Sequence, residues 1–207
     1  MRIGIIGVGN IGGTLARLWV RAGHDVTVSN SRGPDTLGNL VDQLGDRAHA
    51  GTVEEAAAFG DVVLVSVPFG RYQELPSSGF AGKIVIDTNN YYPQRDGQYA
   101  ELDDDRSTSS ELLAGHLEGA RVVKAFNSIF WEHLRDLGRP AGERGRIGLP
   151  VSGDDPEAKR VVAGLINEIG FDAVDAGSLA LGGRKHQPGT TAYTEDLPTE
   201  SLQAALR

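Results

Sequence analysis

The sequence predicts an α/β fold with a doubly wound, mostly parallel sheet and a small C-terminal extension. Short apolar runs alternate with helical patterns along the chain, as expected where helices cover both faces of a parallel sheet. A glycine-rich turn follows the first apolar run directly. The length of 207 residues suits one α/β domain with an extension and is too short for a second full domain.

The strands and helices can be placed from these patterns in chain order. We expect strands at residues 3–6, 26–29, 47–50, 61–67, 83–87, 121–125, 147–152 and 171–175. A first helix follows the glycines, because Ile11, Leu15, Leu18 and Trp19 recur on one helical face. Further helices are expected at residues 34–44, 53–59, 107–117 and 156–169. Residues 1–150 then form the main domain, and residues 151–207 form a small strand-helix-strand part with a tail.

The glycine turn reads Gly7-Val8-Gly9-Asn10-Ile11-Gly12, a G-x-G-x-x-G pattern between a strand and a helix. In this context Gly7 permits the tight turn, Gly9 lets the backbone approach a pyrophosphate, and Gly12 lets the helix pack on the strand. The free N–H groups and the dipole at the helix N-terminus favour phosphate. The pattern therefore predicts a Rossmann dinucleotide-binding domain, with an ordinary strand-turn-helix as the alternative.

The loop after the second strand indicates which dinucleotide is bound. An NAD-binding protein offers a carboxylate to the ribose 2′-hydroxyl about twenty residues after the glycines. Asn30, Ser31 and Arg32 stand there instead. A guanidinium can pair with a 2′-phosphate, and a neighbouring hydroxyl can add a hydrogen bond. These residues favour NADP over NAD, although a solvated loop arginine would look the same in sequence.

Three further loops are expected to line the crevice, because ligands of open parallel sheets lie beyond the carboxyl ends of the strands. Val67 and Pro68 follow the fourth strand, Asn89 follows the fifth, and Asn127 with Ser128 follows the sixth. Their amide and hydroxyl groups could bind the nicotinamide carboxamide, the ribose or a second substrate. A loop-capping role for the Asn and Ser side chains is equally compatible with the sequence.

The chain offers no obvious proton-transfer residue for this crevice. Neither Tyr91 nor Tyr92 has a Lys four residues on, as a Tyr-x-x-x-Lys pair requires. Lys124 lies inside a predicted strand, where a capping or edge position would explain it. We therefore expect no catalytic acid or base, because hydride transfer between two planar cofactors needs mainly orientation and exclusion of water. Without Cys and with scattered His, no metal site is expected.

Composition argues against several classes of partner. The net charge of −8 without basic clusters disfavours nucleic acid and anionic membranes. No apolar run approaches the roughly 18 residues of a membrane helix. Met1 leads directly into the first strand, which leaves no room for a signal peptide. We expect a cytoplasmic protein with a small-molecule co-substrate.

With these features, the chain resembles the NADP-dependent coenzyme F420 oxidoreductases, which move hydride between NADPH and a deazaflavin. The most specific segments are residues 7–12, 29–32, 65–68, 151–155 and 174–179. A Gly-Asp-Asp that opens a helix and an Asp-Ala-Gly that closes the next strand are not general features of Rossmann domains. The resemblance implies NADP as cofactor, coenzyme F420 as co-substrate, a C-terminal part that closes the deazaflavin pocket, and a homodimer.

Other interpretations remain open at this point. Residues 123–129 are similar to the cytosolic domain of the six-transmembrane ferric reductases, so the chain could reduce a free flavin or a ferric chelate with NADPH. A non-catalytic NADP-sensing regulatory protein would suit the absence of a proton-transfer residue. Residues 182–191, with Gly182, Gly183 and Gly189 as hinges and cationic groups between them, are either a lid loop over the pocket or a loose tail.

Overall fold

The computed structural model describes residues 1–207, and its strands form one sheet of eight in the order β3-β2-β1-β4-β5-β6-β7-β8. The strands are β1 Arg2–Ile6, β2 Asp25–Ser29, β3 Ala48–Ala50, β4 Val62–Val65, β5 Ile84–Asp87, β6 Arg121–Lys124, β7 Gly148–Gly153 and β8 Asp172–Gly177. Neighbouring strands are parallel, except that β6 and β7 run antiparallel. The predicted doubly wound, mostly parallel sheet is confirmed.

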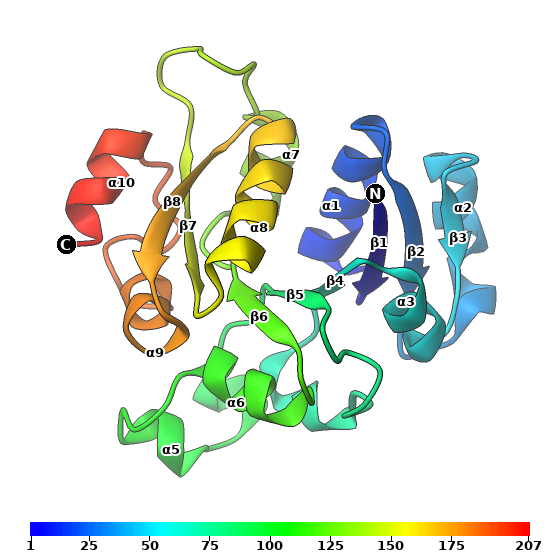
Figure 1. Ribbon diagram of the computed structural model, residues 1–207, viewed down its shortest axis with the longest axis horizontal. Helices are drawn as coiled ribbons and strands as arrows, with labels where there is room; N and C mark the ends of the chain where they lie inside the picture. Colours follow the sequence, from blue (N-terminus) through cyan, green and yellow to red (C-terminus); the bar gives the residue numbers. More distant parts are fainter.

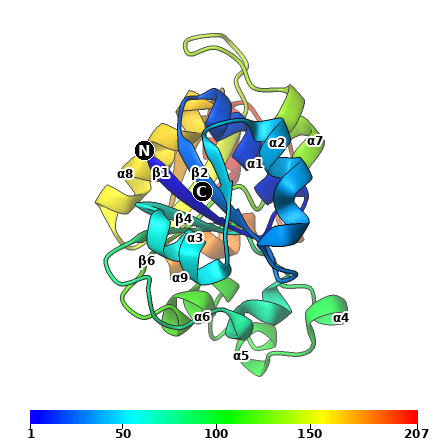
Figure 2. The same cartoon turned by 90° about the vertical axis from the view of Figure 1, so that its right-hand side faces the viewer.

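Helices cover both faces of this sheet, as the views of Figure 1 and Figure 2 show. One face carries α1 Asn10–Arg21, α2 Gly38–Leu44, α7 Trp131–Asp136 and α8 Pro156–Glu168. The other face carries α3 Val53–Phe59, the 3-10 helix η2 Phe69–Glu74 and α6 Ser109–His116. The remaining helical segments are η1 Pro34–Leu37, α4 Pro93–Asp96, α5 Ala100–Asp103, α9 Leu179–Gly182, η3 Gly183–His186 and α10 Thr199–Ala205.

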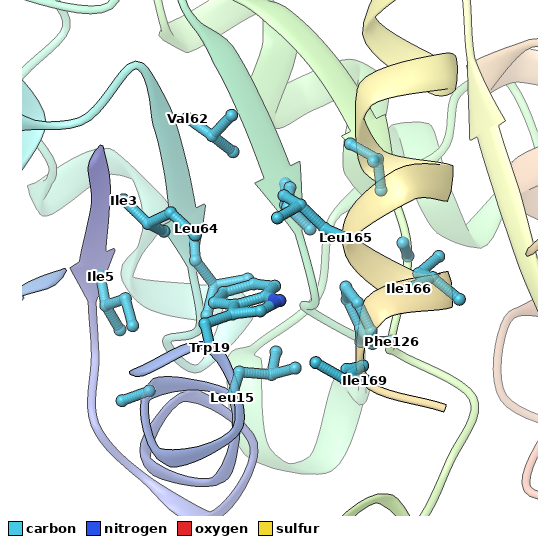
Figure 3. Close-up of a cluster of buried hydrophobic side chains, with 14 of the residues drawn as sticks. Ile3, Ile5, Leu15, Trp19, Val62, Leu64, Phe126, Leu165, Ile166 and Ile169 are labelled. Atoms are coloured by element: carbon cyan, nitrogen blue, oxygen red, sulfur yellow. The ribbon is translucent and has the colours of Figure 1, made fainter. Parts of the chain in front are cut away.

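The alternation of side chains along the strands builds one apolar core on each face. In β1, Ile3 and Ile5 belong to the core beneath α1 and α8, whereas Ile6 belongs to the core beneath α3 and α6. Trp19 of α1 is fully buried, and its ring meets Phe126 edge to face with 5.9 Å between centroids. Figure 3 shows Trp19 in the middle of this cluster, between side chains of β1 and β4 and those of α8. Burial of such large apolar groups fixes α1 against the sheet.

The helices differ from the prediction in detail. The helix expected at residues 34–44 is divided into η1 and α2, and the helix expected at residues 107–117 begins at Ser109. Thr108 ends the preceding loop there, because its side chain caps α6 in a capping box with Glu111. The sequence did not predict α4, α5, α7, α9 or α10, which have four to seven residues each. Helices this short show no clear apolar period.

The C-terminal strands extend the sheet of the N-terminal part. β7 pairs with β6, and β8 pairs with β7. The predicted boundary between residues 150 and 151 falls inside β7. The role of residues 151–207 as a separate part that closes a pocket stays a prediction. For the site, the important consequence of the strand order is that the carboxyl ends of β2, β1, β4, β5 and β6 lie side by side.

Candidate functional site

The turn between β1 and α1 leaves the N-terminus of the helix open. Gly7 has φ of +95°, and a Cβ there would lie 2.2 Å from the carbonyl oxygen of Ser66. A Cβ on Gly12 would lie 2.0 Å from the carbonyl oxygen of Gly7. Gly9 differs, because an added Cβ would meet no heavy atom within 4 Å, and no side chain caps the helix. The first N–H groups of α1 are therefore free to bind an anion.

The loop after β2 is shaped by the side chain of Asn30. Asn30 Oδ1 accepts a hydrogen bond from the backbone N–H of Arg32 at 2.8 Å, and Asn30 Nδ2 donates to Thr36 Oγ1 at 2.9 Å. This Asx turn leaves Ser31 and Arg32 exposed. The Arg32 guanidinium has no hydrogen bond or ion pair within the chain. It is therefore available to an anionic ligand at the end of β2.

Asn89 joins the ends of β4 and β5. Its Oδ1 accepts a hydrogen bond from the Val67 N–H at 3.0 Å, and its own N–H donates to Asp87 Oδ1 at 2.8 Å. The Asn89 carbonyl oxygen accepts from Lys124 Nζ at 2.8 Å. Asn89 is 3% exposed, so it fixes the loop of Val67 and Pro68 from behind. Direct contact of Asn89 with a cofactor stays a prediction.

These loops enclose a cavity of about 400 Å³. The predicted residues that line it are Gly7, Val8, Gly9, Asn30, Ser31, Arg32, Val67 and Pro68. Asn10 lines an adjoining groove between α1 and α2, whereas Ile11 packs against the core and Gly12 is buried. The cavity has apolar walls from Val53 and Leu75 and further charged groups on η2. The structure thus brings together the glycine turn, the Arg32 loop and the loop after β4.

Asn127 does not line this cavity but takes part in a buried chain of hydrogen bonds. Its Nδ2 donates to Asn90 Oδ1 at 3.0 Å and to the His186 carbonyl oxygen at 2.7 Å, and its Oδ1 lies 2.8 Å from His186 Nδ1. Because an amide oxygen only accepts, His186 carries its proton on Nδ1, and Nε2 accepts from Ser152 Oγ at 2.8 Å. Burial, followed by the charge of Lys124, keeps the pKa of His186 well below its ordinary value. A contact of Asn127 with the nicotinamide stays a prediction.

Lys124 ends β6, which lies between β5 and β7, so the expected edge position is wrong. Its Nζ donates to Ser110 Oγ at 3.1 Å and lies 3.6 Å from Asp87 Oδ2, and the side chain is almost wholly buried. Ser110 Oγ donates to the same Asp87 oxygen at 2.6 Å. Burial lowers the pKa of Lys124, and the charge of Asp87 raises it. The ammonium group is enclosed by Asn89, Asp87 and Ser110 and is not exposed to solvent as an accessible base would be.

The C-terminal segment covers the ends of the middle strands. His186 is fully buried, and the Thr194 N–H donates to the Ser128 carbonyl oxygen at 2.9 Å. The hydroxyl groups of Tyr193 and Tyr92 are hydrogen-bonded to each other. The interpretation of residues 182–191 as a loose tail is therefore wrong. A movement of this segment as a lid stays a prediction.

Sequence reasoning missed three residues of these networks. Arg71 and Glu74 lie on η2 and line the cavity, but one short 3-10 helix gives no periodic signal. His186 is 59 residues from Asn127 in sequence, and no local pattern reports a contact over that distance. The local sequence signal for His186 was its position in the basic run at residues 184–186, which marks the segment but not the contact with Asn127.

The cavity fits the phosphate-bearing part of a dinucleotide. It combines the open backbone at Gly9, the uncapped N-terminus of α1, the unpaired Arg32 and apolar walls that suit an adenine ring. No carboxylate stands in the loop directly after β2. The fold is that of a Rossmann-type α/β protein, and the cavity has the features expected of a dinucleotide site.

Comparison with known proteins identifies relatives of the chain. A family model described as NADP oxidoreductase, coenzyme F420-dependent, matches residues 2–91. The solved structure of the protein SMa0349 from Sinorhizobium meliloti is 32% identical with a TM-score of 0.82, covering 96% of this chain and 95% of that one. Residues 2–91 thus match the coenzyme F420-dependent NADP oxidoreductase family, over less than half of the chain.

Two further proteins are similar to the chain over most of its length. Metalloreductase STEAP3 of Rattus norvegicus is 34% identical over 182 residues, which are 86% of this chain and 34% of that protein. The chain thus spans about a third of that relative's length. A structure from Arthrobacter sp. FB24, described as an F420-dependent NADP reductase, is 25% identical with a TM-score of 0.69 and 86% coverage of both chains. Within this chain, no helix has the length and apolar character needed to cross a bilayer.

Proposed function

We propose that the protein is an NADPH-dependent oxidoreductase that transfers hydride between NADP(H) and a deazaflavin coenzyme of the F420 type. The observation that carries the choice of NADP is the unpaired Arg32 guanidinium, which lies in one cavity with the Gly7 to Gly9 turn. A 2′-phosphate would meet a cation there. The family and the similarity to the Arthrobacter reductase support the deazaflavin as the partner.

In this proposal each wall of the cavity has a role. The N–H groups at the start of α1 bind the pyrophosphate, Arg32 with Ser31 binds the 2′-phosphate, and Val53 with Leu75 flanks the adenine. The loop of Val67 and Pro68 directs the ligand toward the ends of β5 and β6. NADPH would supply the hydride when it is bound, and NADP⁺ would accept it in the reverse direction. The protein itself contributes binding, orientation and exclusion of water.

The surroundings of the titratable side chains agree with a protein that binds and orients the cofactors and transfers no proton. Lys124 lies behind Asn89, and the His186 ring is enclosed between Asn127 and Ser152. Tyr193 bonds to the hydroxyl of Tyr92, and burial raises the pKa of Tyr193, so that its hydroxyl stays protonated. Each of these groups has hydrogen-bond partners within the chain, and the transfer of a hydride itself requires no proton carrier.

A second candidate function is NADPH-dependent reduction of a free flavin or a ferric chelate. The observation that favours it is the 34% identity to metalloreductase STEAP3 over most of this chain. The two candidates share the cofactor site and differ in the acceptor. A non-catalytic NADP sensor would share the cofactor site as well.

An anaerobic absorbance assay separates these functions. The purified protein is mixed with NADPH or NADH and with oxidised deazaflavin, FMN or a ferric chelate. Fast reduction of the deazaflavin with NADPH supports the proposal. Turnover with FMN or iron alone would move the protein to the second candidate, and NADPH binding without turnover on any acceptor would favour the sensor.

The family resemblance also leads us to propose a homodimer in the cytoplasm. Light scattering coupled to size exclusion measures the mass directly. Twice the chain mass supports the dimer, and a single chain mass contradicts it. Cell fractionation with an antibody against the protein tests the compartment.

A further inference from the structure

The cavity contains a second arginine, which is held by a carboxylate. Arg71 and Glu74 of η2 both line it. Arg71 Nε lies 3.0 and 2.9 Å from the two carboxylate oxygens of Glu74, and Arg71 Nη2 donates to Glu74 Oε2 at 2.5 Å. Arg71 Nη1 has no hydrogen bond within the chain. The side chains are 49% and 60% exposed, so the pair is open to the solvent of the cavity.

Glu74 is a carboxylate in the same cavity as the loop after β2, which has none of its own. Hydrogen bonding from Arg71 lowers the pKa of Glu74, so Glu74 is ionised at neutral pH. An acidic side chain beside the adenosine ribose accepts a hydrogen bond from a 2′-hydroxyl and repels a 2′-phosphate. The Arg71 guanidinium, in contrast, attracts a 2′-phosphate more strongly than a 2′-hydroxyl. The wall of η2 can therefore favour either form of the ribose, depending on the partner that Arg71 takes.

We propose that Arg71 is a specificity-determining residue for the 2′-phosphate of NADP and that Glu74 competes with this phosphate for Arg71. The inference rests on the proposed use of NADP. Solvent-exposed ion pairs are weak, so Arg71 leaves Glu74 at small cost. A phosphate monoester carries a charge of about −1.5 to −2 at neutral pH and binds a guanidinium more strongly than a carboxylate does. When NADPH binds, its 2′-phosphate replaces Glu74 as the partner of Arg71. When NADH binds, the Arg71–Glu74 ion pair stays intact, and Glu74 accepts a hydrogen bond from the 2′-hydroxyl.

The test is a double-mutant cycle on cofactor affinity. Dissociation constants of NADPH and NADH are measured by titration calorimetry for the wild type, Arg71→Ala, Glu74→Gln and the double variant. Arg71→Ala is expected to weaken NADPH about tenfold, because a charge-assisted hydrogen bond is lost, and to change NADH less. Glu74→Gln is expected to tighten NADPH by about two- to fivefold, since the competitor is removed, and to weaken NADH. This gain should be much smaller when Arg71 is already Ala.

Two outcomes would overturn the inference. Unchanged NADPH affinity in Arg71→Ala removes Arg71 from the site. An equal gain from Glu74→Gln in both backgrounds shows that Glu74 acts through simple repulsion and does not compete for Arg71.

The chain offers a matched control outside the cavity. Arg160 and Glu157 of α8 form an ion pair with the same spacing of three residues, and Arg160 Nη2 lies 2.5 Å from Glu157 Oε1. Glu157→Gln should leave both affinities unchanged. If the wild type fails to bind NADPH, the proposed function itself fails. If NADPH binds through Arg32 and the η2 variants have no effect, the inference about Arg71 and Glu74 fails alone.

Discussion

Arg32 is the charged side chain of the cavity that has no partner, whereas Arg71 and Glu74 neutralise each other. Its position follows from Asn30, whose side chain bonds to the Arg32 N–H and turns the chain outward after β2. We therefore expect Arg32→Ala to weaken NADPH binding by about 1.5–3 kcal/mol, the range for hydrogen bonds to charged groups. NADH, which has no 2′-phosphate, should lose much less. Fluorescence titration with both nucleotides measures the difference.

A control for Arg32 is available in the adjoining groove. Arg17 donates to the Gly13 carbonyl oxygen at 3.0 Å and to Gln43 Oε1 at 3.1 Å, so its guanidinium already has partners. Arg17→Ala should leave the preference for NADPH over NADH in place. Equal weakening of NADPH and NADH in Arg32→Ala would remove the 2′-phosphate role from Arg32.

Gly9 and Gly12 belong to one turn but differ in what surrounds them. A Cβ on Gly9 would meet nothing within 4 Å, whereas one on Gly12 would lie 2.0 Å from a backbone oxygen. Gly9→Val should therefore keep the free energy of unfolding within about 0.5 kcal/mol of the wild type, as for other open surface sites, and abolish NADPH binding. Gly12→Val should destabilise by about 1–3 kcal/mol or more through overpacking. Urea unfolding and nucleotide titration of each variant give both quantities, and unchanged affinity in Gly9→Val would contradict the pyrophosphate site.

At the scale of elements, the strands were predictable because a strand that is buried on both faces of the sheet has a continuous run of apolar residues. The run of β4, Val62–Val65, is fully buried, as expected for an inner parallel strand. The helix α3, Val53–Phe59, was predicted with its observed bounds. In the structure, Thr52 and Glu55 form a capping box at its start, which is also a local signal in the sequence. The short helices near the crevice carry no such signal. Their places are set by tertiary contacts with elements distant in the chain.

The role of Lys124 depends on the position of β6 in the sheet. Because β6 is an inner strand, Lys124 is a buried partner of Asp87 and not an edge residue. It connects β6 to the end of β5 and to α6, through Asn89, Asp87 and Ser110. We expect Lys124→Met to lower the free energy of unfolding by about 3–5 kcal/mol, because it leaves the buried Asp87 charge unpaired. Urea unfolding at neutral pH measures the loss.

The partner substitution tests the physical reason for that loss. In Lys124→Met with Asp87→Asn, both buried charges are gone, so part of the lost stability should return. A single Lys124→Met variant as stable as the wild type would show that the pair is not needed to hold the ends of β5 and β6. A double variant no more stable than the single one would point to lost packing instead of an unpaired charge.

At the scale of the whole molecule, most residues that line the cavity could be predicted to lie together, and the network around Asn127 could not. The glycine turn, the Arg32 loop and the loop after β4 each follow a strand, so local strand-turn-helix patterns indicate that they meet. Around Asn127, the contacts come from Asn90 and His186, 37 and 59 residues away. Long-range hydrogen bonds of this kind arise from the packing of η3 against β7 and β8. They tie the C-terminal segment to the strand ends beside the proposed crevice.

His186 makes this attachment sensitive to pH. Its ring is neutral in the folded protein because burial and the nearby Lys124 charge lower its pKa well below 6.5. The unfolded chain binds a proton at His186 near pH 6.5, as an ordinary His does. The contribution of the neutral ring is therefore complete above that pH and is lost as the pH falls toward the folded pKa. For this one group, the free energy of unfolding should fall by up to about 1.4 kcal/mol per pH unit.

The measurement compares the wild type with His186→Gln by urea unfolding between pH 7.5 and 5, about the range in which His titrates. The variant lacks the titrating ring, so its free energy of unfolding should depend less on pH across this range, even if it is lower throughout. Because the remaining histidines are present in both proteins, their effects cancel in the difference. Parallel curves for the two proteins would mean that His186 can be protonated in place. The enclosure of its ring by Asn127 and Ser152, with Nδ1 donating and Nε2 accepting, would then be wrong.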